Sequence, residues 1–143
     1  MAFKQPHQQL KHYHRYVGYD YSRGASLFIS ISTEPRRRVF GEVVDGKMAL
    51  NDLGREVDRS LSFTFSTAPD LVLYRKKVLP DHCHFRFYLK PGHESLEAIN
   101  LINHAIGRFK SYTTKLYHDA GGPPGPLWQE GCHDWLCMNR QMI

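Results

Sequence analysis

The sequence has few cysteines, no long apolar run and no apolar core near its start. Residues 1–10 are polar, unlike a secretory segment, and no stretch is long and apolar enough to cross a membrane. Cys83, Cys132 and Cys137 are the three cysteines, an odd and small number that argues against a disulfide framework. We therefore expect a cytoplasmic protein with no membrane partner.

What is present is a globular composition with an excess of positive charge. The 143 residues fit one domain, and a hydrophobic content of 41% favours a folded core. Lys and Arg number 19 against 14 Asp and Glu, which gives a net charge of +5. That balance favours an anionic partner, with nucleic acid the first candidate, although many soluble domains carry a similar charge.

Strands are predicted from runs of β-branched and aromatic residues. Asp45-Gly46 lies between two short apolar runs, which is a strong signal for a tight hairpin. The remaining strands are predicted over residues 27–33, 71–79 and 82–89.

Helices are predicted by apolar residues at steps of three and four. Asn51 is a suitable N-cap for a helix over residues 52–63, and Ser95 for a second, longer helix. The expected buried stripe of the long helix is Leu96, Ile99, Ile102, Ile106, Phe109 and Leu116.

The order of these elements predicts an α+β fold, with an antiparallel sheet that carries helices on one face. Split β-α-β folds of the ferredoxin-like or RRM-like kind fit this order. We expect one domain over residues 1–143, which includes a lead-in arm (1–21), a Gly/Pro loop (118–127) and a short C-terminal segment (128–143).

The third predicted strand carries the most informative chemistry. Alternate side chains of a strand point to opposite faces, so His82 and His84 project from one face, about 7 Å apart, while Cys83 points into the core. Two imidazoles on one face can share a divalent metal, which can act as a Lewis acid on a phosphodiester. The alternative is that they are ordinary surface histidines, because isolated His-x-His pairs are common by chance.

Several stretches resemble single-tyrosine transposases, including the REP-associated ones. Pro80-Asp81-His82-Cys83-His84 looks like the family's histidine-hydrophobic-histidine (HUH) motif, which follows a Pro-Asn or Pro-Asp turn. The other similar stretches, in the family's order, are Tyr19-Asp20-Tyr21, residues 40–54, residues 108–113 and Leu127-Trp128-Gln129.

The resemblance implies an HUH nuclease fold and a mechanism. His82 and His84 would hold Mg²⁺ or Mn²⁺ against the scissile phosphate of single-stranded or hairpin DNA. A tyrosine would attack and form a 5′-phosphotyrosine link, which divides one difficult step into two easier ones.

The sequence departs from the family after Trp128-Gln129. The family places its nucleophilic tyrosine and a third metal ligand on a later helix, whereas no tyrosine follows Tyr117 here. We expect a chain truncated before that tyrosine, with a decayed or repurposed copy as the alternative. Tyr117, at the end of the long helix beside a flexible loop, is the one plausible substitute, and Tyr112 is expected to be part-buried.

Basic and aromatic residues predict the DNA contacts. Arg75 and Lys77 share one face of their strand, and Lys76 lies on the other. Tyr88 and the lead-in tyrosines Tyr13, Tyr16, Tyr19 and Tyr21 are candidates for stacking on bases. The candidate DNA-binding residues are Arg36, Arg37, Arg38, Arg75, Lys77, Arg108, Lys110 and Lys115.

Other interpretations stay open at this stage. The same fold can bind a hairpin or single strand without cutting it. A metal-dependent hydrolase with a water nucleophile needs further carboxylates, and Asp81 is the only one close to the histidines. Cys132, His133 and Cys137 lack a fourth zinc ligand at a known spacing. Monomer and homodimer are both compatible with the sequence.

Overall fold

The computed structural model describes residues 19–137 of the chain, and the predicted stacking residues Tyr13 and Tyr16 lie outside this range. In chain order the elements are η2 (Tyr21–Arg23), β1 (Ala25–Ser32), β2 (Gly41–Val44), β3 (Lys47–Leu50), α1 (Asp52–Ser66), β4 (Leu71–Leu79), β5 (His82–Leu89), α2 (Ser95–Asp119) and β6 (His133–Cys137).

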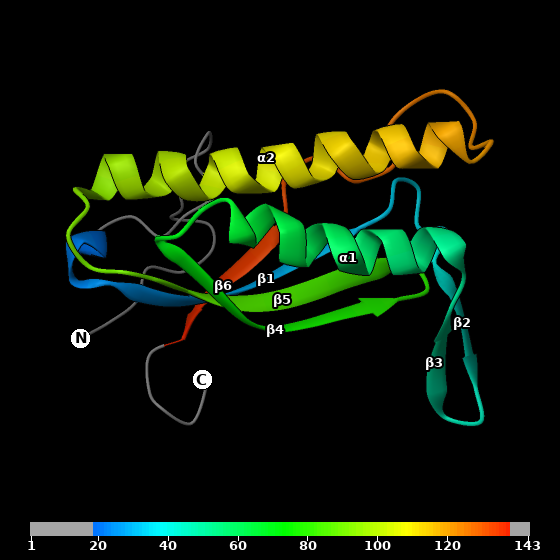
Figure 1. Cartoon of the computed structure of the whole chain (residues 1–143), viewed down its shortest axis with the longest axis horizontal. Coiled ribbons are helices and arrows are strands. Elements are labelled where there is room, and N and C mark those ends of the chain that lie inside the picture. Colours follow the sequence, from blue (N-terminus) through cyan, green and yellow to red (C-terminus); the bar gives the residue numbers. More distant parts are fainter. Residues whose placement is uncertain (1–18, 138–143) are drawn as a thin grey trace.

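Two layers make up the described domain (Figure 1). The main sheet has the order β4-β5-β1-β6 with every neighbouring pair antiparallel, and α1 and α2 lie together on one face of it. The β2–β3 hairpin forms a separate two-stranded sheet that projects at one end. The α+β class, the split β-α-β order and the one-sided helical layer are therefore confirmed.

The hydrophobic core lies between the sheet and the helices. On β5, Cys83, Phe85 and Phe87 are buried on the helical side, and the alternate residues are more exposed on the other side. Phe85 packs against Phe65 of α1 and Phe109 of α2, with ring centroids 5.6 and 6.3 Å apart respectively. The period-two pattern thus fixes which face of β5 remains open.

The predicted helix starts are right for α1 and wrong for α2. Asn51 caps α1, because its side chain accepts a hydrogen bond from the Gly54 N–H at 2.8 Å. Ser95 is the first residue of α2 rather than its cap, and its hydroxyl accepts from the Tyr21 backbone N–H at 3.2 Å. The N-cap of α2, Glu94, makes no capping hydrogen bond with its side chain. The Ser95 hydroxyl, which the local sequence predicts as a helix cap, instead forms a tertiary hydrogen bond with the backbone of η2.

The buried stripe of α2 differs from the predicted one at both ends. Leu96 is 49% exposed, and Leu116 is only half-buried, whereas its neighbour Tyr117 is buried. Tyr112 is 51% exposed rather than part-buried. From Phe109 the buried face continues in steps of four through Thr113 to Tyr117, so Tyr112 falls outside it.

The segment after the Gly/Pro loop contains a strand, β6, that the sequence pattern did not predict. β6 pairs with β1 and completes the main sheet. Trp128 is buried against Phe40 and Phe109, and its Nε1–H donates to Thr113 Oγ1 at 2.8 Å. No helix in residues 19–137 combines the length and the apolar character of a membrane span.

Candidate metal centre and nucleic-acid interface

The two histidines lie on the sheet face opposite the helices. His82 and His84 begin β5, where they pair across to Ser32 and Ser30 of β1, and their ring centroids are 6.1 Å apart. Both rings are half-buried. The predicted same-face placement is therefore what the structure shows. No third His, Cys, Asp or Glu among the described residues converges with them.

Asp81 holds the first of these rings. Its Oδ1 lies 2.8 Å from His82 Nδ1 and accepts a hydrogen bond from Arg36 Nη2 at 3.2 Å. The hydrogen bond to His82, followed by that to Arg36, lowers the pKa of the Asp81 carboxyl. An ionised carboxylate can only accept, so Nδ1 carries the proton and Nε2 is left with its lone pair for a metal.

The second ring is held by stacking rather than by a carboxylate. His84 stacks on Phe28 of β1, with ring centroids 5.3 Å apart. Burial, and then the electrostatic influence of His82, Lys77 and Arg86, lower the pKa of His84. A lowered pKa favours the neutral imidazole, which is the form that binds metals.

Basic side chains accompany the histidines on this open face. Lys77 pairs with His84, and Arg75 pairs with Arg86, so all three cations project to the same side. Lys76 points to the helical side, where its ammonium meets Asp58 at 3.0 Å. Arg86 was not among the predicted DNA-binding residues, although its position two residues after His84 would have placed it there.

The basic run 36–38 divides between two environments. Arg36 reaches Asp81 beside the histidines, and Arg38 is exposed. Arg37 turns inward: its Nη1 donates to the Tyr117 hydroxyl at 2.8 Å, and its guanidinium carbon lies 5.4 Å from the centroid of that ring. Arg37 therefore holds the loop against α2.

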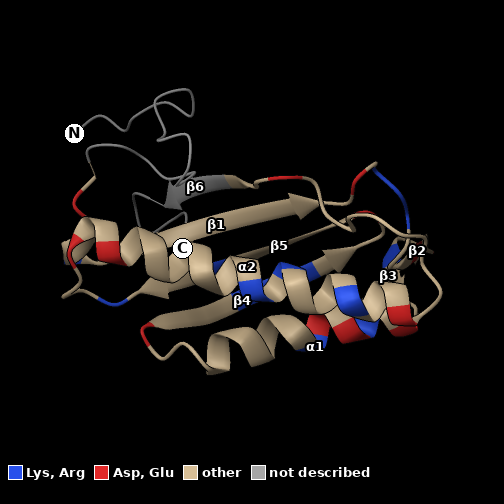
Figure 2. Ribbon diagram, turned by 90° about the horizontal axis from the view of Figure 1, so that it is seen from above, with Lys and Arg blue, Asp and Glu red and all other residues tan. Residues whose placement is uncertain are grey.

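The basic residues of α2 lie on the helical layer (Figure 2), whereas the histidines project from the opposite face of the sheet. Arg108 donates to Thr67 Oγ1 at 2.8 Å, and Lys115 forms an exposed ion pair with Asp119 at 2.8 Å. The structure thus divides the predicted DNA-binding residues between two sides of the sheet.

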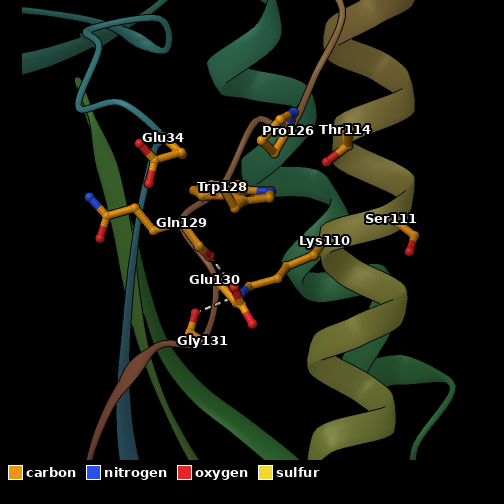
Figure 3. A pocket seen from close by; sticks show the side chains of 9 residues that line it. All are labelled: Glu34, Lys110, Ser111, Thr114, Pro126, Trp128, Gln129, Glu130 and Gly131. Atoms are coloured by element: carbon orange, nitrogen blue, oxygen red, sulfur yellow. Dashed lines mark hydrogen bonds between the residues drawn. The ribbon is translucent and has the colours of Figure 1, made fainter.

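Lys110 lines a pocket of about 740 Å³ between α2 and residues 126–131 (Figure 3). Burial lowers the pKa of its ammonium, which donates to the carbonyls of Gln129 and Gly131 at 3.1 and 2.5 Å. Glu34 and Glu130 also line this pocket. A cation already engaged by carbonyls, beside two carboxylates, gives a poor site for phosphate.

The tyrosines of α2 also differ from expectation. Tyr117 is 6% exposed and held by Arg37, although it lies at the helix end beside the Gly/Pro loop. Tyr112 is exposed, but it projects from the helical layer. Neither phenol lies on the open face with the histidines.

Cys83 and Cys132 form no metal site with any other described side chain, and the Cys137 side chain lies outside those described. Cys83 is fully buried, which raises the pKa of its thiol, and Cys132 packs against the core. His133 pairs with Ser30 on the side of β1 opposite His84, so it shares the open face. Only the β6 register reveals that placement.

Comparison with known proteins points to one kind of fold. No protein-family model matches the sequence, and no curated protein matches it. The structure of a REP-associated tyrosine transposase bound to a REP hairpin superposes with a TM-score of 0.55 at 15% identity, covering 89% of this chain and 64% of that chain. The fold is that of a tyrosine transposase.

A second solved transposase fold supports this result. A protein assigned as a transposase from Deinococcus radiodurans R1 superposes with a TM-score of 0.54 at 18% identity, covering 87% of this chain and 85% of that chain. The chain spans 64% of the length of the hairpin-bound transposase. These identities establish a shared transposase fold, and the resemblance seen in the sequence is confirmed at that level.

Proposed function

We propose that this chain is the metal- and DNA-binding part of a single-tyrosine transposase, which binds single-stranded or hairpin DNA and acts on its phosphodiester backbone. One observation carries the proposal: His82 and His84 project together from the open sheet face of a transposase fold. The hairpin bound to the first structural neighbour supports DNA as the partner.

His82 and His84 suit two positions around Mg²⁺ or Mn²⁺. Asp81 orients His82 so that Nε2 is the metal-binding atom, and the burial of His84 favours its neutral form. Hard cations prefer oxygen, so water and phosphate oxygens would fill the other positions. When bound, the metal would polarise a phosphodiester oxygen and stabilise the negative charge that develops on it.

The chain's own residues would bind and orient the DNA. Lys77 and Arg75 lie on β4 beside the histidine strand, where their positive charges favour a phosphate backbone. Arg36 holds Asp81 and contributes positive charge at the end of the strand.

A binding module without cleavage is the second candidate function. The observation that favours it is the placement of the α2 tyrosines, since the Tyr117 hydroxyl is buried against Arg37 and Tyr112 lies on the helical layer. A phosphotyrosine link needs a phenol in line with the phosphorus and near the metal. The hydrolase alternative has little support, because Asp81 is already engaged by His82 and Arg36.

A labelled DNA hairpin with a single-stranded flank tests both functions. The chain is incubated with it and Mn²⁺, then run on native and denaturing gels. We expect DNA binding that weakens steeply with salt, and no denaturation-resistant adduct. Tighter binding to plain duplex, or binding without salt dependence, would contradict the proposed DNA partner.

The Tyr117→Phe variant is the control for the nucleophile. We expect it to bind the hairpin like the parent chain, with no adduct in either case. An adduct that the parent forms and this variant does not would show that Tyr117 is the nucleophile after all.

A further inference from the structure

The open face of the main sheet carries its basic residues on two neighbouring strands, β4 and β5. β1, β4 and β5 contain no Asp or Glu in their sequences. Arg75, Lys77 and Arg86 all project to the open side. A surface with cations on β4 and β5, and no carboxylate in these strands or in β1, is complementary to a phosphate chain.

An exposed aromatic ring lies at the far end of this surface. Tyr88 is 38% exposed, and its neighbours across the strands are Ser26 on β1 and Val72 on β4. It follows His84 by four residues, which is about 13 Å along the strand. Four-stranded sheets that bind single-stranded RNA stack two or three bases on aromatic side chains of one face.

Phe28 fixes the side chains between these two ends. His84 stacks on its ring, and the Arg86 guanidinium carbon lies 5.3 Å from its centroid. A guanidinium held over an aromatic ring is fixed in place, and its planar shape suits phosphate oxygens. The open face therefore offers an ordered row from His84 through Arg86 to Tyr88.

We propose that a single strand of DNA follows β5 across the open face from His84 to Tyr88. Its phosphates lie against Lys77, Arg75 and Arg86, and one base stacks on the Tyr88 ring. This inference rests on the proposed function and deepens it, because it assigns the path of the strand next to the metal pair.

The geometry favours a single strand over a duplex. A base can stack on Tyr88 only when its own face is free, and the bases of a duplex are stacked on one another. Paired bases also keep the backbone at the duplex surface, where the sheet would meet phosphates but no base face. The aromatic contact is therefore the part of the surface that selects single strands.

Fluorescence anisotropy with a short labelled single-stranded oligonucleotide, in EDTA and at several salt concentrations, tests the path. Tyr88→Leu is expected to weaken binding about tenfold and leave the salt slope unchanged, whereas Tyr88→Trp retains binding. Arg75→Gln combined with Lys77→Gln is expected to lower the salt slope by about 1.4, at about 0.7 for each phosphate that the protein no longer neutralises.

Matched controls come from the helical layer. Tyr112→Leu removes a still more exposed ring from α2, and Arg59→Gln removes an exposed cation from α1, and both are expected to leave binding unchanged. An equal or larger decrease from either control, an unchanged salt slope in the double variant, or tighter binding of the same sequence as RNA or duplex would overturn the proposal.

Mn²⁺ titration of the parent chain and of Tyr88→Leu, run beside the anisotropy series in EDTA, separates this inference from the metal proposal. If Tyr88→Leu weakens DNA binding while neither chain binds Mn²⁺, the path stands and the metal proposal is wrong. If Mn²⁺ binds the parent and Tyr88→Leu has no effect, the path is wrong and the metal proposal stands.

Discussion

The two sides of the main sheet use the same residue types for different purposes. On the helical side, Arg37 and Lys110 donate to protein oxygens, and Lys76 pairs with Asp58. On the open side, the Arg75 and Lys77 side chains make no hydrogen bond or ion pair with any other described residue. A cation used within the fold stabilises it, whereas an unengaged cation remains available to a ligand.

The histidines show the same contrast. His93 links α2 to the turn before β4, because its ring nitrogens lie 2.6 and 2.7 Å from the carboxylates of Glu97 and Asp70. His82 uses one nitrogen for Asp81, and its other nitrogen is not used by that contact. Residue type alone therefore cannot assign function here, and the partners of each side chain decide it.

The largest expected effect is the disappearance of metal binding from the open side. Replacing His82 and His84 with alanine removes both nitrogen donors, and we expect no Mn²⁺ binding in a calorimetric or paramagnetic titration. His104→Ala, an exposed histidine on α2, is the matched control and should bind as the parent does. Equal Mn²⁺ affinity in the double variant and the parent would show that His82 and His84 do not bind the metal.

A smaller effect is expected when the support of the first ring is changed. Asp81→Asn keeps the size of the side chain but removes the charge that holds the proton on His82 Nδ1. Changes of this kind weaken metal binding about 10- to 100-fold, so Mn²⁺ affinity should fall within that range. Asp58→Asn, which alters the ion pair on the helical side, should leave it unchanged. Unchanged Mn²⁺ affinity in Asp81→Asn would show that Asp81 does not orient His82.

Local patterns predicted much of the architecture. The bounds of β4 and β5 are those expected from the sequence, because long runs of alternating burial identify a strand without knowledge of its partner. The same alternation placed His82 and His84 on one face. β6 was missed because it is short and is held by pairing to β1, more than a hundred residues earlier in the chain.

The side chains around the candidate site are held by contacts between residues far apart in sequence, which no local pattern can predict. Arg37 and Tyr117 are 80 residues apart in sequence, and Arg36 and Asp81 are 45 apart. The basic run 36–38 looked uniform, yet the fold turns Arg37 inward and leaves its neighbours outside. Residue type and spacing thus predicted that the two histidines share one face of the strand, but not which cations the protein itself would engage.

Two tyrosines on α2 allow a test of how much the Arg37–Tyr117 hydrogen bond stabilises the fold. Tyr117→Phe leaves Arg37 without an acceptor for one hydrogen bond, and we expect the free energy of unfolding to fall by about 1.5 kcal/mol. Tyr112→Phe removes an exposed hydroxyl and should change it by less than about 0.5 kcal/mol. Urea unfolding of both variants checks the difference, and Mn²⁺ affinity should be unaffected in each. Equal stability of the two variants would show that the Arg37 contact adds nothing to the fold.

The smallest expected effect is a pH dependence of stability at His93. Hydrogen bonds to Glu97 and then Asp70 raise the pKa of His93 above its ordinary value. Its stabilising contribution is therefore fully present below about pH 6.5 and disappears as the pH rises through the folded-state pKa. Because both carboxylates are partly exposed, the contribution should be about 0.2–1 kcal/mol.

Urea unfolding at pH 6 and pH 8.5 should show a larger fall in stability for the parent than for His93→Gln, with His104→Gln behaving like the parent. The comparison with His93→Gln cancels the opposite trend from His84, whose lowered pKa favours the folded state as the pH rises. An identical pH response in His93→Gln and the parent would mean that the His93 ring contributes no protonation-dependent link between the turn before β4 and α2.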